Sequence, residues 1–84
     1  LREHDPAMAQ MIAAQILRDV WDGGSDSPTD EAFLASYSLF LATLALDEVD
    51  GANELAQRWI PLAMDAEPSE GSQAWLGAID EINL

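Results

Sequence analysis

The residues that could carry out chemistry in this sequence are few. The single histidine, His4, stands between Glu3 and Asp5 near the N-terminus, and no serine is placed to use it as a base. The chain has no cysteine, so a transition-metal site would rest on carboxylates and one imidazole, a poor ligand set for zinc. We therefore predict no catalytic residue, no metal site and no cofactor, and we interpret the chain as a non-enzymatic protein.

Two short segments superficially suggest ligand-binding loops. The acidic run 47–51, DEVDG, lacks the alternating ligands and the twelfth-position glutamate of a calcium loop. The pair Gly23-Gly24 follows no predicted strand, so a helix cap explains it better than a phosphate-binding loop does. Both segments are interpreted as helix ends.

The charge of the chain is strongly lopsided. Sixteen Asp or Glu residues stand against three Arg, with no Lys, and the formal net charge is −13. Nucleic acids and anionic membranes are bound through Lys and Arg, so we predict no direct nucleic-acid binding and no membrane binding. A basic protein surface is the natural partner, although solubility or a salt-adapted host would also explain the acidity.

Many of the acids are expected near helix C-termini, where each opposes the helix dipole by about 0.3 to 1 kcal/mol at low salt. They are Asp19, Asp22, Asp47, Glu48, Asp65, Glu67, Asp80 and Glu81. A basic partner would offset this cost, and so would high salt.

Start and stop signals predict four helices. We expect them at about residues 5–21, 27–48, 52–66 and 69–82. The expected starts are Asp5-Pro6, a Ser27 cap, the Asp50-Gly51 turn, and a cap at Ser69 or Ser72. Proline removes a backbone hydrogen bond, so Pro61 predicts a kink or a break in the third helix. The fold class is therefore all-α, a four-helix antiparallel bundle in a single domain over residues 1–84.

The second expected helix contains a fifteen-residue stretch without charge, AFLASYSLFLATLAL at 32–46. It is shorter than the ~20 residues that span a bilayer, and no basic region precedes an apolar core near the N-terminus, so we expect a cytoplasmic protein. The chain opens with Leu1 rather than Met, which leaves open that it is a piece of a longer protein.

A helical wheel divides that stretch into two opposite apolar faces. One carries Phe33, Tyr37, Phe40, Leu41 and Leu44, and the other carries Ala35, Leu39, Ala42, Leu46 and Val49. Between them lies a narrow polar strip of Ser36, Thr43 and Asp47. A helix that is apolar nearly all round is buried on more than one side, within its own domain or against another chain.

The segment from Gly51 to Pro68 resembles the second half of a tetratricopeptide repeat (TPR). Gly51 corresponds to the turn, Ala56 and Ala63 to the small packing positions, and Ile60 to a large apolar position. Upstream the likeness fades, and Pro61 is foreign to the repeat. The resemblance implies a TPR-like stack of helical hairpins as the alternative arrangement, with peptide or protein binding and no catalysis.

Two functions follow from these patterns. The first is a protein–protein interaction module, a TPR-like adaptor or small chaperone-like subunit that shields an apolar or amphipathic segment of a partner. The second is an acidic nucleic-acid mimic that inhibits a DNA- or RNA-binding protein by occupying its basic groove. A self-sufficient bundle and a homodimer also remain open. The predicted partner-binding residues are Phe33, Tyr37, Phe40, Leu41, Leu44, Asp47, Glu48, Asp50 and Trp59.

Overall fold

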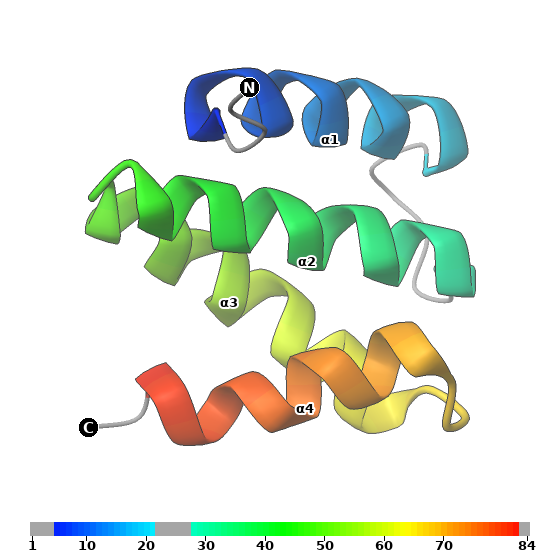
Figure 1. Ribbon diagram of the computed structural model, residues 1–84. Helices are drawn as coiled ribbons and strands as arrows, with labels where there is room; N and C mark the ends of the chain where they lie inside the picture. The colour runs from blue at the N-terminus through cyan, green and yellow to red at the C-terminus, as the bar shows by residue number, and fades with distance from the viewer. Residues whose placement is uncertain (1–4, 22–27, 83–84) are drawn as a thin grey trace.

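The computed structural model describes residues 5–21 and 28–82, with side chains as far as Ile79. It contains α1 (Pro6–Val20), α2 (Asp30–Ala45), α3 (Val49–Asp65) and α4 (Glu70–Ile82), and none of the described residues lies in a strand (Figure 1). The predicted all-α helical bundle is confirmed. No helix in the described ranges combines the length and the apolar character needed to cross a membrane.

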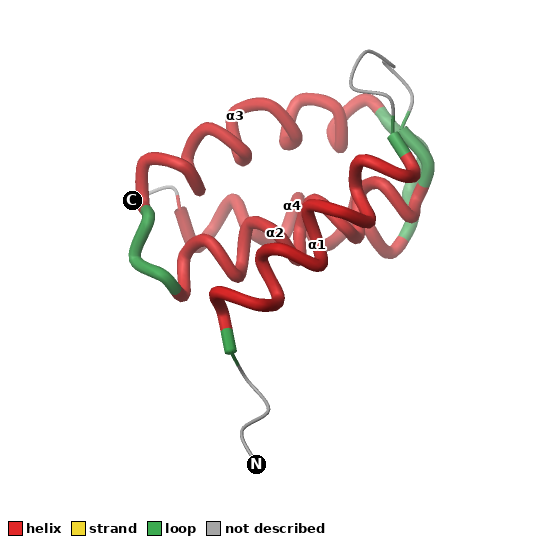
Figure 2. The backbone as a smooth tube through the Cα atoms, turned by 90° about the horizontal axis from the view of Figure 1, so that it is seen from above, coloured by secondary structure: helices red, strands yellow, loops and turns green. Residues whose placement is uncertain are grey.

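The helix α2 lies at the centre of the fold. In Figure 1, α1 runs above it, α4 below it and α3 behind it, and the view from above in Figure 2 separates α3 from the layer that the other helices form. The three helices α2, α3 and α4 all contact one another, whereas α1 packs along α2 alone among the described helices. The fold is therefore a three-helix bundle with α1 laid on the outer side of its central helix.

The start of α1 agrees with the prediction. Asp5 is the N-cap, and its carboxylate accepts a hydrogen bond of 3.1 Å from the amide of Ala7, while Pro6 occupies the first helical position. The expected stop at residues 22–24 lies outside the described residues, and so does Ser27. The cap of α2 is Thr29, whose hydroxyl accepts from the amide of Ala32.

The turn between α2 and α3 differs from the prediction. The helix α2 ends at Ala45 rather than near Glu48, and Asp47 adopts a left-handed φ of 63°. The amide of Glu48 then donates to the carbonyl of Thr43 at 3.1 Å, which closes the helix end as a Schellman motif does. Gly51, expected to fill this turn, lies inside α3 instead, so the turn is made by an aspartate and not by the glycine.

This short turn also changes the electrostatic interpretation of the acidic run. Glu48 is the N-cap of α3, and Asp50 lies in its first turn, where the helix dipole favours negative charge. Glu48 was expected to oppose a helix dipole, and this expectation is wrong in part. Glu48 lies where the C-terminus of α2 meets the N-terminus of α3, and the dipole of α3 favours its negative charge. Asp47 alone of the three sits in the closing turn of α2.

Replacing Asp47 with glycine is expected to stabilise the domain by about 1 kcal/mol. Glycine adopts positive φ without steric cost, and the change also removes a carboxylate from the C-terminal end of α2. In a domain of this size the melting temperature should rise by about 4 to 8 °C. Thermal unfolding followed by circular dichroism should rank the variants Gly, then Asn, then Ala, and an Asp47→Ala protein as stable as Asp47→Gly would contradict the role of the turn.

The helix α3 continues through Pro61 as a single helix, and its path is bowed in Figure 2. Pro61 was expected to cause a kink or a break, and the break does not occur. Pro61 and Gln57 are both exposed, so water can satisfy the Gln57 carbonyl that loses its intrahelical donor. The helix also begins earlier than expected, at Val49, because the turn before it is so short.

The start of α4 confirms the predicted serine cap. The amide of Ser72 donates to the Ser69 hydroxyl at 3.2 Å, and the amide of Ser69 donates to the Ser72 hydroxyl at 2.9 Å. This is a capping box in which a serine replaces the usual glutamate. Next to it, the amide of Gly71 donates to the Asp30 carboxylate at 2.7 Å, which ties the start of α4 to the start of α2.

The core lies between α2, α3 and α4 and is built from aromatic rings and alanines. Its largest members are Phe33, Phe40, Trp59 and Trp75, each at most 1% exposed. The rings of Phe40 and Trp75 lie 5.0 Å apart, and those of Phe33 and Trp59 lie 5.6 Å apart. Buried alanines of α3 and α4 let the helices approach closely around these rings.

Candidate functional site

The structure separates the predicted partner-binding residues into three groups. Phe33, Phe40 and Trp59 are buried in the domain's own core, and Tyr37 and Leu44 pack against it partly buried. The predicted acids Asp47, Glu48 and Asp50 are exposed around the turn between α2 and α3. Leu41 is exposed at the edge of the aromatic face of α2, at 43%. The aromatic side chains therefore stabilise the bundle and offer little surface to a partner.

The domain's own helices cover most of both apolar faces of α2. The exceptions are Leu41, which is 43% exposed, and Val49, which lies in α3 and is 49% exposed. The aromatic face packs on α3 and α4, and the alanine face lies against α1, where Ala35 and Ala42 are 7% exposed. The expected polar strip is largely buried as well: Ser36 is 0% and Thr43 is 4% exposed. Ser36 accepts a hydrogen bond from Trp75 Nε1 at 2.9 Å, and this satisfies the indole inside the core.

The helix α1 packs against α2 along its length. The side chain of Gln10 donates to the Thr43 hydroxyl and to the Glu48 carboxylate, both at 3.1 Å. On the same side, Ala13 is buried and Leu17 packs against the core. The contact follows one stripe of α1, although apolar residues fill about half of the circumference of the helix.

The remaining apolar residues of α1 face water. Met8, Ile12 and Ile16 are 55, 52 and 45% exposed. They follow one another at four-residue spacing and therefore lie on one face of the helix. One stripe of α2 is also exposed, formed by Leu34, Ser38, Leu41 and Ala45.

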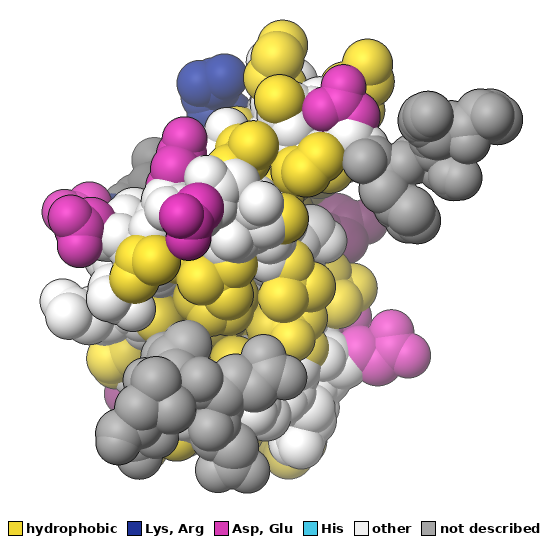
Figure 3. All heavy atoms as spheres, turned by 60° about the vertical axis from the view of Figure 1, so that its left-hand side comes forward, with side chains coloured by type: hydrophobic (Ala, Val, Ile, Leu, Met, Phe, Trp, Pro, Cys, Tyr) yellow, Lys and Arg dark blue, Asp and Glu magenta, His cyan; other side chains and the backbone are white. Residues whose placement is uncertain are grey.

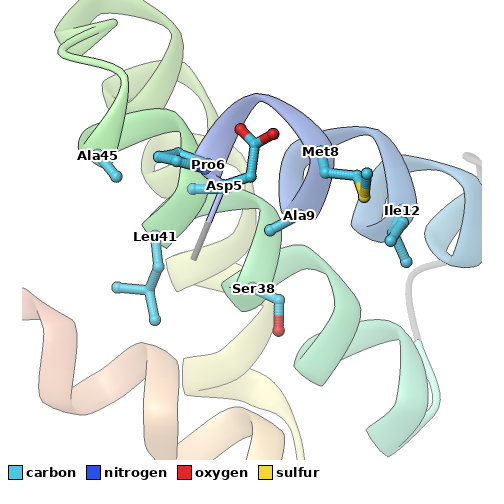
Figure 4. Close-up of a pocket in the computed structure, with 9 residues that line it drawn as sticks. Asp5, Pro6, Met8, Ala9, Ile12, Ser38, Leu41 and Ala45 are labelled. Carbon is cyan, nitrogen blue, oxygen red and sulfur yellow. The ribbon is translucent and has the colours of Figure 1, made fainter. Parts of the chain in front are cut away.

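These two rows form the walls of a continuous apolar hollow, called here the α1–α2 groove. Its two halves measure about 440 and 560 Å³ and share Ala9, Ile12 and Ser38. One half reaches Pro6 and Ala45, and the other reaches Val20 and Glu31, so the helices that line it are antiparallel. The close-up in Figure 4 shows the row from Met8 to Ile12 on α1 beside Ser38 and Leu41 on α2.

Small residues give the groove its depth. Ala13, Ala35 and Ala42 are at most 7% exposed and form its floor. Larger aliphatic side chains stand on both sides of this floor. All six aromatic residues of the chain belong to the core or pack against it, so the walls are lined by Met, Ile, Leu and Ala instead.

The two charged residues that line the groove are both acidic. Asp5 lines one end and Glu31 the other, and Asp19 lies on the same face of α1 as Ile12 and Ile16, at helical spacing from both. No Lys or Arg is among the described residues that line the groove. In Figure 3, hydrophobic side chains form a band from the top of the view, where α1 lies, down through its middle. Asp and Glu side chains lie beside this band, and a basic side chain lies at its upper left.

A second hollow, of about 410 Å³, lies near the start of α2 and is lined by Asp30, Asp65, Glu67 and neighbouring residues. The Asp30 carboxylate is already bonded to the Gly71 amide. Within the described ranges, no group of three or more His, Cys, Asp or Glu residues is arranged to hold a metal ion.

The wall residues Met8, Ile12, Ile16 and Leu34 were not among the sequence predictions of partner contacts. A signal for them was present, because apolar residues cover more of α1 than one neighbouring helix can bury. The signal was ambiguous, since the same width is expected of a helix packed between two others. Of the predicted contact residues, Leu41 is the one that lines the groove.

Comparisons of the chain with protein-family models, with curated proteins and with solved structures found no match in any of the three.

Proposed function

We propose that this protein is a non-enzymatic interaction module, an adaptor or small chaperone-like subunit that shields an apolar or amphipathic segment of a partner protein. The observation that carries the proposal is the α1–α2 groove, a mainly aliphatic surface that runs along two helices. Contiguous exposed apolar surface bordered by polar residues is typical of interaction sites.

The exposed side chains of α1 that line the groove are not part of the core that stabilises the domain. Its core is complete without Met8, Ile12 and Ile16, because the buried cluster consists of residues from α2, α3 and α4. Leaving these side chains in water forgoes about 1.5 to 3 kcal/mol for each one that could be fully buried. A partner segment in the groove would recover part of that free energy, which favours a binding role for α1.

The resemblance to a TPR is part of this proposal. Ala56 and Ala63 are 2% and 1% exposed, and this close packing of α3 on α2 supports the assignment of the pair as a TPR-like hairpin. The position of Gly51 inside α3 departs from the repeat. The proposed binding surface does not depend on the resemblance, since it lies on α1 and on the side of α2 that faces away from α3.

Ile12→Asp and Leu41→Asp test the proposal. Both residues are exposed on the groove walls, so the charge should leave folding intact, and burying it against an apolar partner should weaken binding at least about tenfold. The measurement is capture of partner proteins from an extract of the source organism by each variant. Circular dichroism should confirm that all the variants are folded.

Met64→Asp is the matched control. Met64 is 65% exposed on α3, away from the groove, and its variant carries the same added charge. A partner captured by the wild type and by Met64→Asp, and lost by both groove variants, would support the proposal. Equal capture by all four proteins would refute it.

A further inference from the structure

The shape of the α1–α2 groove restricts what can fill it. On α2 the lining runs from Glu31 to Ala45, a length of about 21 Å at the rise of an α-helix. The only hydroxyl in the described lining is that of Ser38, whereas a small-molecule site usually brings several polar groups to one place. An elongated apolar segment of a protein therefore fits the groove better than a compact ligand does.

The walls of the groove favour a helix over an extended strand. Their backbone groups are engaged within α1 and α2, so the groove offers no free edge to which a strand could bond. Their side chains form ridges at helical spacing, with Met8, Ile12 and Ile16 on one wall. A third helix of about four turns, with apolar residues every three or four positions, can set its own ridges between them.

The charge of the groove determines the chemistry of that helix. Asp5 lies at one end, Glu31 at the other, and Asp19 beside the Glu31 end, in a chain of formal net charge −13 without Lys. A second copy of this chain would bring the same acids to the same ends, and the repulsion would oppose a homodimer. Lys or Arg residues flanking the apolar face of another protein would instead be attracted to all three carboxylates.

We propose that the α1–α2 groove binds a basic amphipathic helix of another protein, about four turns long. Its apolar face packs between Ile12 and Leu41, and its basic residues lie near Asp5, Asp19 and Glu31. This assignment rests on the proposed function, because it names the partner of the same surface.

Three synthetic peptides of about four turns test the assignment. The first has Leu at three- and four-residue spacing and Lys at the flanking positions. The second keeps the Leu residues and replaces Lys with Glu, and the third keeps the Lys residues and replaces Leu with Ser. Binding of each labelled peptide to the full chain is measured by fluorescence anisotropy at about 50 mM and about 500 mM salt.

The Leu–Lys peptide should bind the wild-type chain. The Ile12→Asp variant should bind it at least about tenfold more weakly, since a charge would then be buried in the apolar contact. Raising the salt concentration should lower the affinity of the Leu–Lys peptide about three- to tenfold and leave measurable binding, because salt screens the flanking charges and not the apolar contact. The Leu–Glu and Ser–Lys peptides should each bind at least about tenfold more weakly, as each lacks one of the two contributions.

Two triple variants with equal net charge test which carboxylates contribute to the affinity for the Leu–Lys peptide. The groove triple is Asp5→Asn, Asp19→Asn and Glu31→Gln, in which the asparagine introduced at position 5 can still cap α1. The control triple is Asp50→Asn, Asp65→Asn and Glu67→Gln, which neutralises three exposed acids away from the groove. The groove triple should lose about three- to tenfold in affinity for the Leu–Lys peptide, and the control triple less than about twofold.

The outcomes separate this inference from the proposed function. Equal binding of the Leu–Glu and Leu–Lys peptides, still abolished by Ile12→Asp, would overturn the basic partner and leave the interaction module standing. Equal binding of the Ser–Lys and Leu–Lys peptides, unaffected by Ile12→Asp, would overturn both proposals in favour of a purely acidic surface. Failure of all three peptides, with a dimer in sedimentation that Ile12→Asp dissociates, would overturn the inference and identify the groove as a contact between two copies.

Discussion

Replacing Gly71 with alanine is expected to destabilise the domain by about 3 kcal/mol. A Cβ at this position would overlap the Cβ of Phe33 and lie 2.9 Å from both the Asp30 carbonyl oxygen and its carboxylate. Two of these three atoms belong to the backbone or lie next to it, so α4 would have to move away from α2. That movement would also weaken the hydrogen bond of 2.7 Å from the Gly71 amide to Asp30.

In urea denaturation monitored by tryptophan fluorescence, the unfolding midpoint of Gly71→Ala should be lower than that of the wild type by about 1 to 3 M. Gly77→Ala is the matched control, because nothing lies within 4 Å of the Cβ that it would add in the same helix. Alanine is the better helix former, so this control should be more stable than the wild type by about 0.5 to 1 kcal/mol. Two alanine variants that both stabilise the protein would show that α4 does not need the close approach at Gly71.

Ser36→Ala is expected to cost about 1 to 3 kcal/mol, a large effect for the loss of one hydroxyl. Ser36 and Trp75 are both 0% exposed, and the Ser36 hydroxyl accepts the indole N–H at 2.9 Å while donating to the Phe33 carbonyl. Without the serine, the indole donor would remain buried with no partner. The cost therefore comes mainly from the desolvated N–H and not from the small volume that is lost.

Ser38→Ala provides the control for this prediction, because Ser38 is exposed on the same helix and the change should alter stability by less than about 0.5 kcal/mol. A double-mutant cycle with Trp75→Phe isolates the hydrogen bond from the cavity that the smaller ring leaves. The coupling between positions 36 and 75 should be about 1 kcal/mol or more in chemical denaturation. Additive effects of the two changes would mean that the bond contributes no net stability.

Two helix starts could be predicted from local chemistry. Asp5-Pro6 and Ser69 carry their own capping groups, and the structure confirms both starts. The turn after α2 could not be predicted in this way, because Gly51 was the obvious residue for a left-handed conformation and Asp47 adopts it. The backbone there is set by the closing hydrogen bonds of α2 and by the immediate start of α3, which no single residue specifies.

The close approach at Gly71 was also beyond sequence reasoning. A glycine in the first turn of a helix is ordinary by itself, and its importance arises from the Phe33 and Asp30 atoms that lie against it. Likewise, Ser36 belonged to an apparent polar strip, and only the fold brings the indole of Trp75 beside it. Contacts between residues about 40 positions apart depend on how the helices cross, and periodicity within one helix carries no information on that.

The sequence alone determined that this protein is helical and strongly acidic, with one histidine and no cysteine, and that its second helix is apolar on two opposite faces. These properties follow from composition, capping residues and helical periodicity, which act within a few residues. Only the tertiary structure decided which apolar surface remains exposed. The aromatic face of α2 packs inward because large rings bury the most surface between three helices, and α1 covers the alanine face because small side chains allow close contact. The groove then arises between α1 and the exposed stripe of α2, since one helix laid on another can bury only one of its sides.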